Sequence, residues 1–462
     1  MPPAKKNRRK VPLAKKSKRT QSGYVGSEPS AVTALVLHPR FSKRRNGSAA
    51  SRDTESSLEE AVRLTDAIGL KIAHSESVTV VSPRPATLFG SGRVESTGQL
   101  VRELDVEVAV VDGKLSPVQQ RNLERAWDCK VIDRTGLILE IFGARARTRE
   151  GRLQVDLAAL EYQRSRLVRS WTHLERQRGG FGFMGGPGET QIEADRRQIS
   201  ERIARLKREL EQLTRTRGLH RSSRQKVPYP VVALVGYTNA GKSTLFNRLT
   251  DSNVLAKDML FATLDPTMRG VSLPSGQRII LSDTVGFISD LPTTLIAAFR
   301  ATLEEVLEAD LIVHVRDSSH PDTNQQKLDV LAVMEELGVS ADAEERMLEA
   351  HNKIDLLDDT TRAILSAKSH KDVHLASVSA HTGDGIGELL QKFEELLSSN
   401  RQILELQISL SDGATLAWLY RHGDVLSRED VDGMARVKVG LDAPNVARFQ
   451  RRQESADILL QN

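Results

Sequence analysis

Apolar and polar residues in the first third of the chain follow the pattern of strands that alternate with helices. Ala31–Leu37 and Val106–Val111 are short apolar runs typical of buried strands, whereas Leu58–Ile68 and Pro117–Ala126 carry apolar residues at helical spacing. Such an alternation favours a small α/β domain with a largely parallel sheet. We therefore expect this domain over residues 29–150.

The pattern changes at Gln154, where large apolar residues begin to recur at steps of three, four and seven. This heptad-like spacing predicts two long helices packed as an antiparallel hairpin over residues 151–226. The two apolar stripes consist of Leu157, Leu160, Leu167, Trp171 and Leu174, and of Ile192, Ile199, Ile203, Leu206, Leu210 and Leu213. Between them, Gly179–Gly188 is too rich in glycine for a helix, and Thr190–Glu193 predicts a capping box that starts the second helix.

Strands and helices alternate again over residues 227–400, which predicts a second α/β domain. A shorter segment, 401–462, follows it. In that segment Ile403–Leu410 and Ala435–Leu441 alternate as strands do, with helical stretches between and after them. We expect a small α+β unit there.

A phosphate-binding loop opens the second α/β domain. The strand Val231–Val235 runs directly into Gly-Tyr-Thr-Asn-Ala-Gly-Lys-Ser, which matches G-x-x-x-x-G-K-[ST]. The glycines let backbone N–H groups face the α- and β-phosphates, the lysine neutralises β- and γ-oxygens, and the serine hydroxyl suits Mg²⁺. The nucleotide contacts expected here are Gly236, Tyr237, Thr238, Asn239, Ala240, Gly241, Lys242, Ser243 and Thr244.

A second strand, Ile279–Ser282, ends in the D-x-x-G box of GTP-binding proteins, formed by Asp283, Thr284, Val285 and Gly286. The aspartate would reach Mg²⁺, and the glycine N–H can touch the γ-phosphate. The next residue is Phe287, where Ras-like proteins carry a glutamine that orients the attacking water. A phenyl ring cannot orient water by hydrogen bonds, so we expect slow intrinsic hydrolysis.

A polar loop that contains a proline, Phe261–Thr267, lies about 20 residues after the lysine and separates these two boxes. The nucleotide contacts expected in this loop are Phe261, Ala262, Thr263, Leu264 and Asp265. A threonine in such a loop can bind Mg²⁺ and the γ-phosphate before hydrolysis and release them afterwards. We choose Thr263 for this role, with Thr267 as the alternative. The expected catalytic residues are thus Lys242, Thr263 and Gly286, and the expected Mg²⁺ ligands are Ser243, Thr263 and Asp283.

Two further boxes predict that the base is guanine. One follows the strand Met347–His351 and comprises Asn352, Lys353, Ile354 and Asp355; the other ends a later strand and comprises Ser377, Val378, Ser379 and Ala380. The Asp355 carboxylate can accept N–H bonds from guanine N1 and its amino group, a pair that adenine lacks. The Ala380 N–H could hold guanine O6. Four boxes in this order, each at the carboxyl end of a strand, predict a GTP and GDP site.

Composition limits the cellular locations that are compatible with this chain. No apolar run approaches the ~20 residues that span a bilayer, so we expect no membrane insertion. The single cysteine, Cys129, excludes an intrachain disulfide, and a cytoplasmic monomer is the expectation. Cys129 stands close to Trp127 in a helical pattern, and we expect it to pack there instead of serving as a nucleophile.

The net charge of +5 is unevenly distributed. Residues 1–20 carry nine Lys or Arg and no acid, and residues 151–226 carry 17 basic and 9 acidic residues. Two basic segments on an otherwise acidic chain indicate a polyanionic partner such as RNA. For residues 1–28 the alternative is a disordered solubilising tail. At the hairpin tip, Phe181 or Phe183 can stack on bases or pack onto a neighbouring domain.

The four boxes resemble those of the HflX family of translation-factor-like GTPases. The resemblance extends to the run Gly186–Arg197, similar to that family's signature ahead of the GTP-binding domain, and covers about residues 31 to 400. It implies a GTPase that binds the large ribosomal subunit, is stimulated by ribosomes, and in some members splits stalled ribosomes. Gly185 stands where the family often has an arginine.

Other interpretations remain open. The chain could be a GTP-binding protein that gates an RNA-modifying site, or an RNA scaffold that uses GTP structurally. Gly90-Ser91-Gly92-Arg93 could hold a phosphate or form a plain turn. Asn239 could help to hold K⁺, as an asparagine does in several G proteins that lack the glutamine, or could simply favour a turn.

Overall fold

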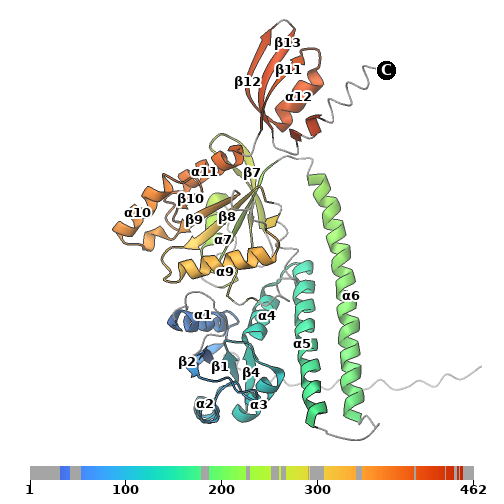
Figure 1. The fold of residues 1–462 in the computed structure, drawn as a ribbon, viewed down its shortest axis with the longest axis vertical. Coiled ribbons are helices and arrows are strands. Elements are labelled where there is room, and N and C mark those ends of the chain that lie inside the picture. The colour runs from blue at the N-terminus through green and yellow to red at the C-terminus, as the bar shows by residue number, and fades with distance from the viewer. Residues whose placement is uncertain are drawn as a thin grey trace, which may run out of the picture.

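The computed structural model describes residues 32–41, 54–177, 187–224, 229–250, 260–261, 267–289, 291, 306–307, 309–339, 346–399, 402–431, 433–441, 445–446 and 448–450. They form three sheets with their helices and one long helical hairpin (Figure 1). The basic tail, the hairpin-tip residues Phe181 and Phe183, and the loop residues Ala262–Asp265 lie outside the described residues.

The first sheet is parallel and has the strand order β2-β1-β3-β4. Its strands are β1 (Thr33–Phe41), β2 (Lys71–Val80), β3 (Val108–Val111) and β4 (Lys130–Asp133). Helices α1 (Thr54–Asp66) and α4 (Arg134–Arg145) pack on one face, and α2 (Ser91–Glu103) and α3 (Pro117–Trp127) on the other. Because helices cover both faces, the central strands are apolar throughout, as the sequence predicts.

The predicted elements of this domain are confirmed, with differences at their ends. Strand β1 starts two residues later than expected and continues to Phe41, and α1 begins four residues ahead of Leu58. Strand β2 had no prediction, because it lies at the sheet edge and most of its side chains are at least partly exposed. An edge strand of this kind shows no continuous apolar run.

The hairpin consists of α5 (Arg149–Gln177) and α6 (Pro187–Arg224), which lie side by side (Figure 1). Leu160, Ile203 and Leu206 are buried between them, in agreement with the predicted stripes. The capping box expected at Thr190 is wrong: α6 already begins at Pro187, since proline suits the first turn of a helix. The hairpin is tied to the first domain by Asp133, which accepts bonds from the Tyr162 hydroxyl at 2.5 Å and the Arg166 guanidinium at 2.6 Å.

The second sheet has the order β10-β9-β8-β5-β7-β6, in which only β6 runs antiparallel to its neighbour. Its strands are β5 (Val231–Gly236), β6 (Thr267–Ser272), β7 (Arg278–Asp283), β8 (Leu311–Asp317), β9 (Met347–Asn352) and β10 (Leu375–Ser377). Its described helices are α7 (Lys242–Thr250), α9 (Thr323–Glu336), α10 (Asp359–Ser369) and α11 (Ile386–Ser399), with a 3₁₀ turn at Ile354–Leu356.

The last sheet is antiparallel and small, with the order β11-β13-β12. It comprises β11 (Gln402–Ser409), β12 (Asp424–Val431) and β13 (Met434–Leu441), and α12 (Gly413–His422) packs on one face. The α+β prediction is confirmed, although β12 was not foreseen. No helix in the described part of the chain combines the length and apolar content that a membrane crossing requires.

Candidate functional site

The predicted boxes meet along one edge of the second sheet. Strands β5, β7, β8, β9 and β10 are parallel, so their carboxyl ends lie at the same edge. The phosphate loop follows β5 at the centre, the D-x-x-G box follows β7 on one side, and the two base boxes follow β9 and β10 on the other. The expected phosphate contacts therefore lie at the centre of this edge, and the expected base contacts lie at its end.

Two loop positions accept only glycine. Gly236 has a φ of 149°, and a Cβ there would stand 2.2 Å from the Val315 carbonyl oxygen. Gly241 has a φ of 91°, and its Cβ would stand 2.2 Å from Nδ2 of Asn352. Both requirements come from the close approach of the loop to neighbouring strand ends.

The lysine of the loop is held by the loop itself. Lys242 is buried, and its Nζ donates to the carbonyls of Gly236 at 3.1 Å and Tyr237 at 2.8 Å. An ammonium group has three hydrogens, so one remains for a phosphate oxygen. Burial lowers the pKa of Lys242 to about 8, although the nearby Asp283 carboxylate opposes that shift.

This pKa predicts that diphosphate binding weakens in mild alkali. Phosphate favours the charged lysine, so the pKa of Lys242 rises in the complex, and binding above pH 8 must take up a proton. We expect the Kd for GDP to rise about fivefold from about pH 7.5 to about pH 8.8. Titration of GDP against pH measures this, with GMP, which lacks the β-phosphate, as the control. An equal rise for both nucleotides would show that another group titrates.

Oxygen ligands suited to Mg²⁺ lie beside the lysine. The Ser243 hydroxyl donates to Oδ2 of Asp283 at 2.7 Å, and Asp283 is fully buried. A hydroxyl and a carboxylate are hard oxygen donors of the kind Mg²⁺ takes, so the residues present fit the ion. The first-choice ligand Thr263 lies outside the described residues, whereas the alternative, Thr267, begins β6 directly opposite Asp283.

Phe287 is fixed by the phosphate loop. Its N–H donates to the Gly236 carbonyl at 3.1 Å, and its carbonyl accepts from Thr238 N at 2.7 Å. Its ring is buried in the core, and a Cβ on the preceding Gly286 would come within 3.0 Å of Lys242 Nζ. The residue that follows Gly286 therefore turns an apolar ring into the core and offers no side-chain hydrogen bond to a water beside that glycine.

The base boxes are joined by Asn352. Its Nδ2 donates to the Ala240 carbonyl at 2.8 Å, and its Oδ1 accepts from Ala380 N at 2.9 Å. The Ala380 N–H that we expected at guanine O6 is thus already engaged, and a base oxygen would share it. The hydroxyl of Ser379 donates to Oδ1 of Asp355 at 2.6 Å, which fixes one carboxylate oxygen and orients the other. Lys353, with a φ of 65°, donates to Asp317 at 2.6 Å.

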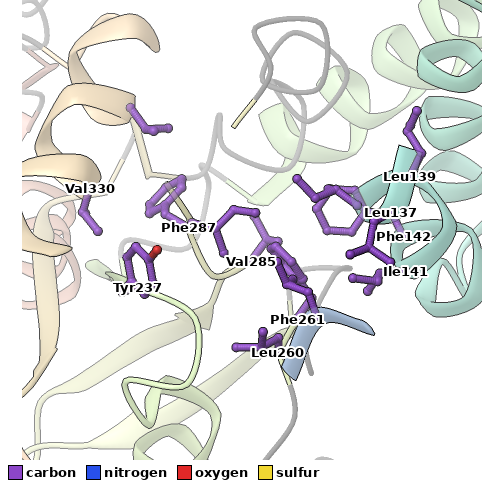
Figure 2. Packing of buried hydrophobic residues seen from close by; sticks show 14 of the residues in the cluster. Leu137, Leu139, Ile141, Phe142, Tyr237, Leu260, Phe261, Val285, Phe287 and Val330 are labelled. Atoms are coloured by element: carbon purple, nitrogen blue, oxygen red, sulfur yellow. The ribbon is translucent and has the colours of Figure 1, made fainter. Parts of the chain in front are cut away.

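Apolar side chains of the first domain pack against the nucleotide loops (Figure 2). Phe142 of α4 makes an edge-to-face contact with Phe261, their ring centroids 4.6 Å apart. Phe261 starts the loop that contains Thr263, and Phe287 belongs to the same buried cluster. The interface is therefore continuous with the site.

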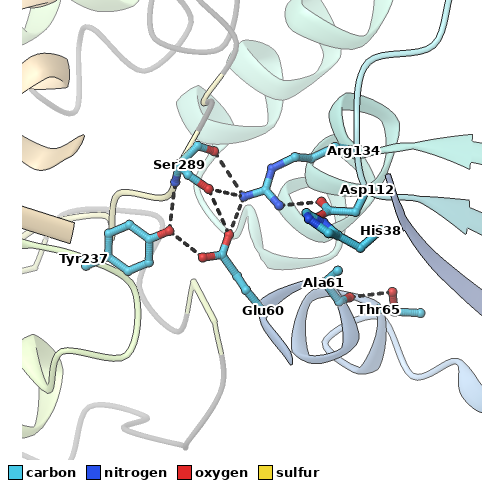
Figure 3. Close-up of polar contacts among 8 residues, drawn as sticks. All are labelled: His38, Glu60, Ala61, Thr65, Asp112, Arg134, Tyr237 and Ser289. Atoms are coloured by element: carbon cyan, nitrogen blue, oxygen red, sulfur yellow. Dashed lines mark hydrogen bonds and ion pairs between the residues drawn. The ribbon is translucent and has the colours of Figure 1, made fainter. Parts of the chain in front are cut away.

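A buried polar network crosses the same interface (Figure 3). Glu60 of α1 accepts a hydrogen bond from the Tyr237 hydroxyl, and that hydroxyl also accepts from Ser289 N at 3.0 Å. Arg134 donates to Glu60, to Asp112 at 2.5 Å and to the Ser289 hydroxyl at 2.8 Å. Burial disfavours the charge on Arg134, but the Asp112 and Glu60 carboxylates outweigh it and raise its pKa.

The sequence predicted Tyr237 as a nucleotide contact, but it did not indicate that its hydroxyl bonds to Glu60 and Ser289, nor that Arg134 belongs to the same network. Glu60 and Tyr237 are 177 positions apart, and Arg134 and Ser289 are 155 apart. The sequence held only weak signs of the network: Tyr237 is the second residue of the phosphate loop, and Arg134 directly follows the strand β4. Neither indicates its partner without the packed structure.

The structure also bears on two minor candidates, Cys129 as a nucleophile and the turn Gly90–Arg93 as a phosphate site. Cys129 is half-buried against the first core, and burial raises its pKa to about 11, so it is a poor nucleophile. Gly90 precedes α2 in an extended conformation, and Arg93 forms an ion pair with Glu76. That pairing agrees with a plain turn.

Comparison with known proteins gives family matches along most of the chain. The models described as GTP-binding GTPase N-terminal and GTP-binding GTPase Middle Region match residues 55–143 and 145–224. The model described as 50S ribosome-binding GTPase matches residues 231–353, and the HflX C-terminal domain matches residues 364–457.

Two proteins named GTPase HflX are similar to this chain over most of their own length. The protein of Magnetococcus marinus is 50% identical over 87% of this chain and 92% of its own length. The one of Escherichia coli is 44% identical over 84% of this chain and 88% of its own. Because such identity extends across the P-loop domain and both flanking regions, this chain belongs to the HflX family and is a GTPase.

Proposed function

We propose that the chain is a ribosome-associated switch whose GTP form binds the large ribosomal subunit and whose hydrolysis of GTP resets it. The splitting or rescue of stalled ribosomes under stress is the outcome we expect from that cycle. Its partners are then GTP or GDP with Mg²⁺ and ribosomal RNA, and its place is the cytoplasm, where ribosomes work. We expect a monomer, with the residues of the four boxes as the site.

The observation that carries the proposal is the joining of a P-loop site to a long basic hairpin. Residues 151–226 hold 17 basic and 9 acidic residues, and the described basic side chains of α6 are exposed. These are Arg196, Arg197, Arg202, Arg205, Lys207, Arg208 and Arg215. Exposed arginines along a helix can follow the phosphates of RNA. The match to a model described as 50S ribosome-binding GTPase supports the same partner.

Sedimentation with purified large subunits tests the binding. A non-hydrolysable GTP analogue should carry the protein into the subunit fraction, and GDP should leave it in the supernatant. The double variant Arg202→Gln, Arg205→Gln should bind more weakly. The slope of the logarithm of its binding constant against the logarithm of the salt concentration should be shallower by about one for each lost phosphate contact. The control exchanges two exposed lysines, one in the last turn of α10 and one just after that helix, Lys368→Gln and Lys371→Gln. Equal binding in both nucleotide states would overturn the switch.

Hydrolysis by the isolated protein should be slow, and ribosomes should accelerate it by orders of magnitude. The reason is the buried phenyl ring of Phe287, which supplies no hydrogen bond to a water beside Gly286. Phosphate release with and without large subunits measures the difference. Rapid turnover by the protein alone would contradict this expectation.

We also propose that Asn239 helps to hold K⁺ against the nucleotide phosphates, where the ion would balance charge that develops during hydrolysis. Asn239 has a φ of 61° and borders a cavity of about 50 Å³. Two carboxylates of the cavity lining, Glu59 and Asp317, are paired with Arg63 and Lys353, so the oxygen that would hold the ion is that of the Asn239 amide.

The potassium proposal predicts faster GTP hydrolysis in KCl than in NaCl at equal ionic strength. The variant Asn239→Gly removes the amide while it tolerates the positive φ, so the salt difference should vanish without backbone strain. Asn239→Ala should also lose the difference in rate between the two salts, and its backbone should be strained because alanine disfavours a positive φ. Equal rates of the unaltered protein in both salts would remove K⁺ from the site.

A further inference from the structure

Two arginines outside the four boxes lie behind the loops that are expected to recognise the base. Arg248 is in the last turn of α7, the helix that follows the phosphate loop. Arg362 is in the first half of α10. The guanidinium of each arginine donates hydrogen bonds to backbone carbonyls, and the two arginines hold different loops.

Arg362 holds the loop of the Asp355 box. Its Nε donates to the Ile354 carbonyl at 3.0 Å, and its NH2 donates to the carbonyls of Asp355 at 3.3 Å and Leu357 at 3.4 Å. Helix α10 is itself fixed at its start, where Asp358 accepts from Thr361 N at 2.9 Å. The guanidinium thus connects the start of α10 to the backbone that carries the Asp355 carboxylate.

Arg248 holds the other loop. Its Nε donates to the Ala380 carbonyl at 3.2 Å, its NH2 donates to the His381 carbonyl, and its guanidinium lies near Gly383. A peptide unit is planar and trans, so a held carbonyl fixes the direction of the N–H in the same unit. The brace on Ala380 O and His381 O therefore sets the orientation of two successive peptide units beside the expected O6 contact.

We propose that Arg362 and Arg248 are positioning residues for base recognition, each responsible for one edge of guanine. Arg362 places the carboxylate that reads the N1 and amino edge, and Arg248 places the loop whose N–H reads O6. The inference rests on the proposed base boxes and adds the two residues that hold the backbone of those boxes in position. Guanidinium suits this role because its planar set of donors can bind several carbonyls at once, which a lysine ammonium cannot reproduce.

Base analogues separate the two edges. Inosine diphosphate lacks the 2-amino group that Asp355 would accept, and 6-thioguanosine diphosphate replaces O6 with sulfur, a weak acceptor. The measurement is the Kd of GDP, IDP and 6-thio-GDP for the full chain and for Arg362→Met and Arg248→Met. Methionine keeps much of the aliphatic stem and removes the donors. Thermal unfolding of each variant without nucleotide reports its fold.

In Arg362→Met, GDP should bind about two- to tenfold more weakly, the size of one or two lost hydrogen bonds. The preference for GDP over IDP should shrink by a similar factor, while the preference over 6-thio-GDP stays unchanged. Arg248→Met should show the reverse: reduced discrimination against 6-thio-GDP and unchanged discrimination against IDP. A matched control, Arg269→Met, exchanges an exposed arginine on β6 and should alter neither ratio.

A purely structural role would weaken all three nucleotides by the same factor in each variant, and that result would overturn the inference. If Arg362→Met or Arg248→Met is too unstable to assay, Arg362→Lys and Arg248→Lys take its place and should shift the same ratio in the same direction. Unchanged ratios in the lysine variants would also overturn it. Failure of the base boxes themselves is distinguishable, because the unaltered protein would then bind GDP and IDP equally well.

Discussion

Replacing Asp355 by asparagine is expected to exchange guanine preference for xanthine preference. The carboxylate oxygens accept from guanine N1 and the amino group, and an amide would instead present a donor to the xanthine 2-carbonyl. Ser379 strengthens the expectation, because its hydroxyl donates to Oδ1 of Asp355 at 2.6 Å. That bond can keep the amide oxygen of the variant in place and direct its NH₂ group at the base.

We expect GTP affinity to fall by about a hundredfold or more and XTP affinity to rise well above that of the unaltered protein, since sites built around hydrogen bonds discriminate strongly. Competition binding of GTP and XTP measures both. Asp355→Ala is the control, which should lose GTP without gaining XTP. Asp355→Asn combined with Ser379→Ala should lose part of the new preference, as the amide is then free to rotate. Full GTP affinity with no gain for XTP in Asp355→Asn would show that another group reads the base.

Removal of the Asn352 side chain is expected to weaken both the fold and the nucleotide site. This amide is buried and connects the phosphate loop, through the Ala240 carbonyl, to the base loop, through the Ala380 N–H. Asn352→Ala leaves both backbone groups without this partner in the protein interior. Each orphaned group costs about 1–3 kcal/mol, so the free energy of unfolding should fall by about 2 kcal/mol or more.

GDP affinity of Asn352→Ala should fall about tenfold, because the loops expected on either side of the nucleotide lose their connection; about tenfold corresponds to one lost neutral hydrogen bond. Denaturant unfolding without nucleotide and GDP titration measure the two effects. Asn352→Asp keeps an acceptor for Ala380 N but places a carboxylate against the Ala240 carbonyl. It should therefore lose no less affinity than the alanine variant. Unchanged stability and affinity in Asn352→Ala would contradict the bridging role.

Much of the fold could be predicted because it depends on local patterns. Buried parallel strands such as β5 and β3 are continuous apolar runs, and amphipathic helices such as α3 repeat their apolar residues at helical spacing. Strand β2 escaped prediction because an edge strand needs no apolar run, and the start of α6 was misplaced because proline fits a first helical turn.

The candidate site was foreseen to the extent that each box is local. A phosphate loop carries its own glycines, lysine and serine within eight consecutive residues, so the chemistry can be recognised in the sequence alone. The contacts between boxes were not foreseeable from that pattern. The bridge formed by Asn352, the bond from Ser379 to Asp355 and the pairing of Thr267 with Asp283 depend on strands that are distant in the chain.

The alternation of strands and helices, the phosphate chemistry and the expected choice of base follow from residue type and spacing, so the amino-acid sequence was enough to predict them. The residues that pack behind these loops became visible only in the folded chain: Arg362 and Arg248 behind the expected base loops, and Glu60 and Arg134 on the phosphate-loop side. The physical reason is that a charged side chain on a helix is compatible with many surroundings. Its partner is set by which helix packs beside which loop, and that is a property of the whole fold.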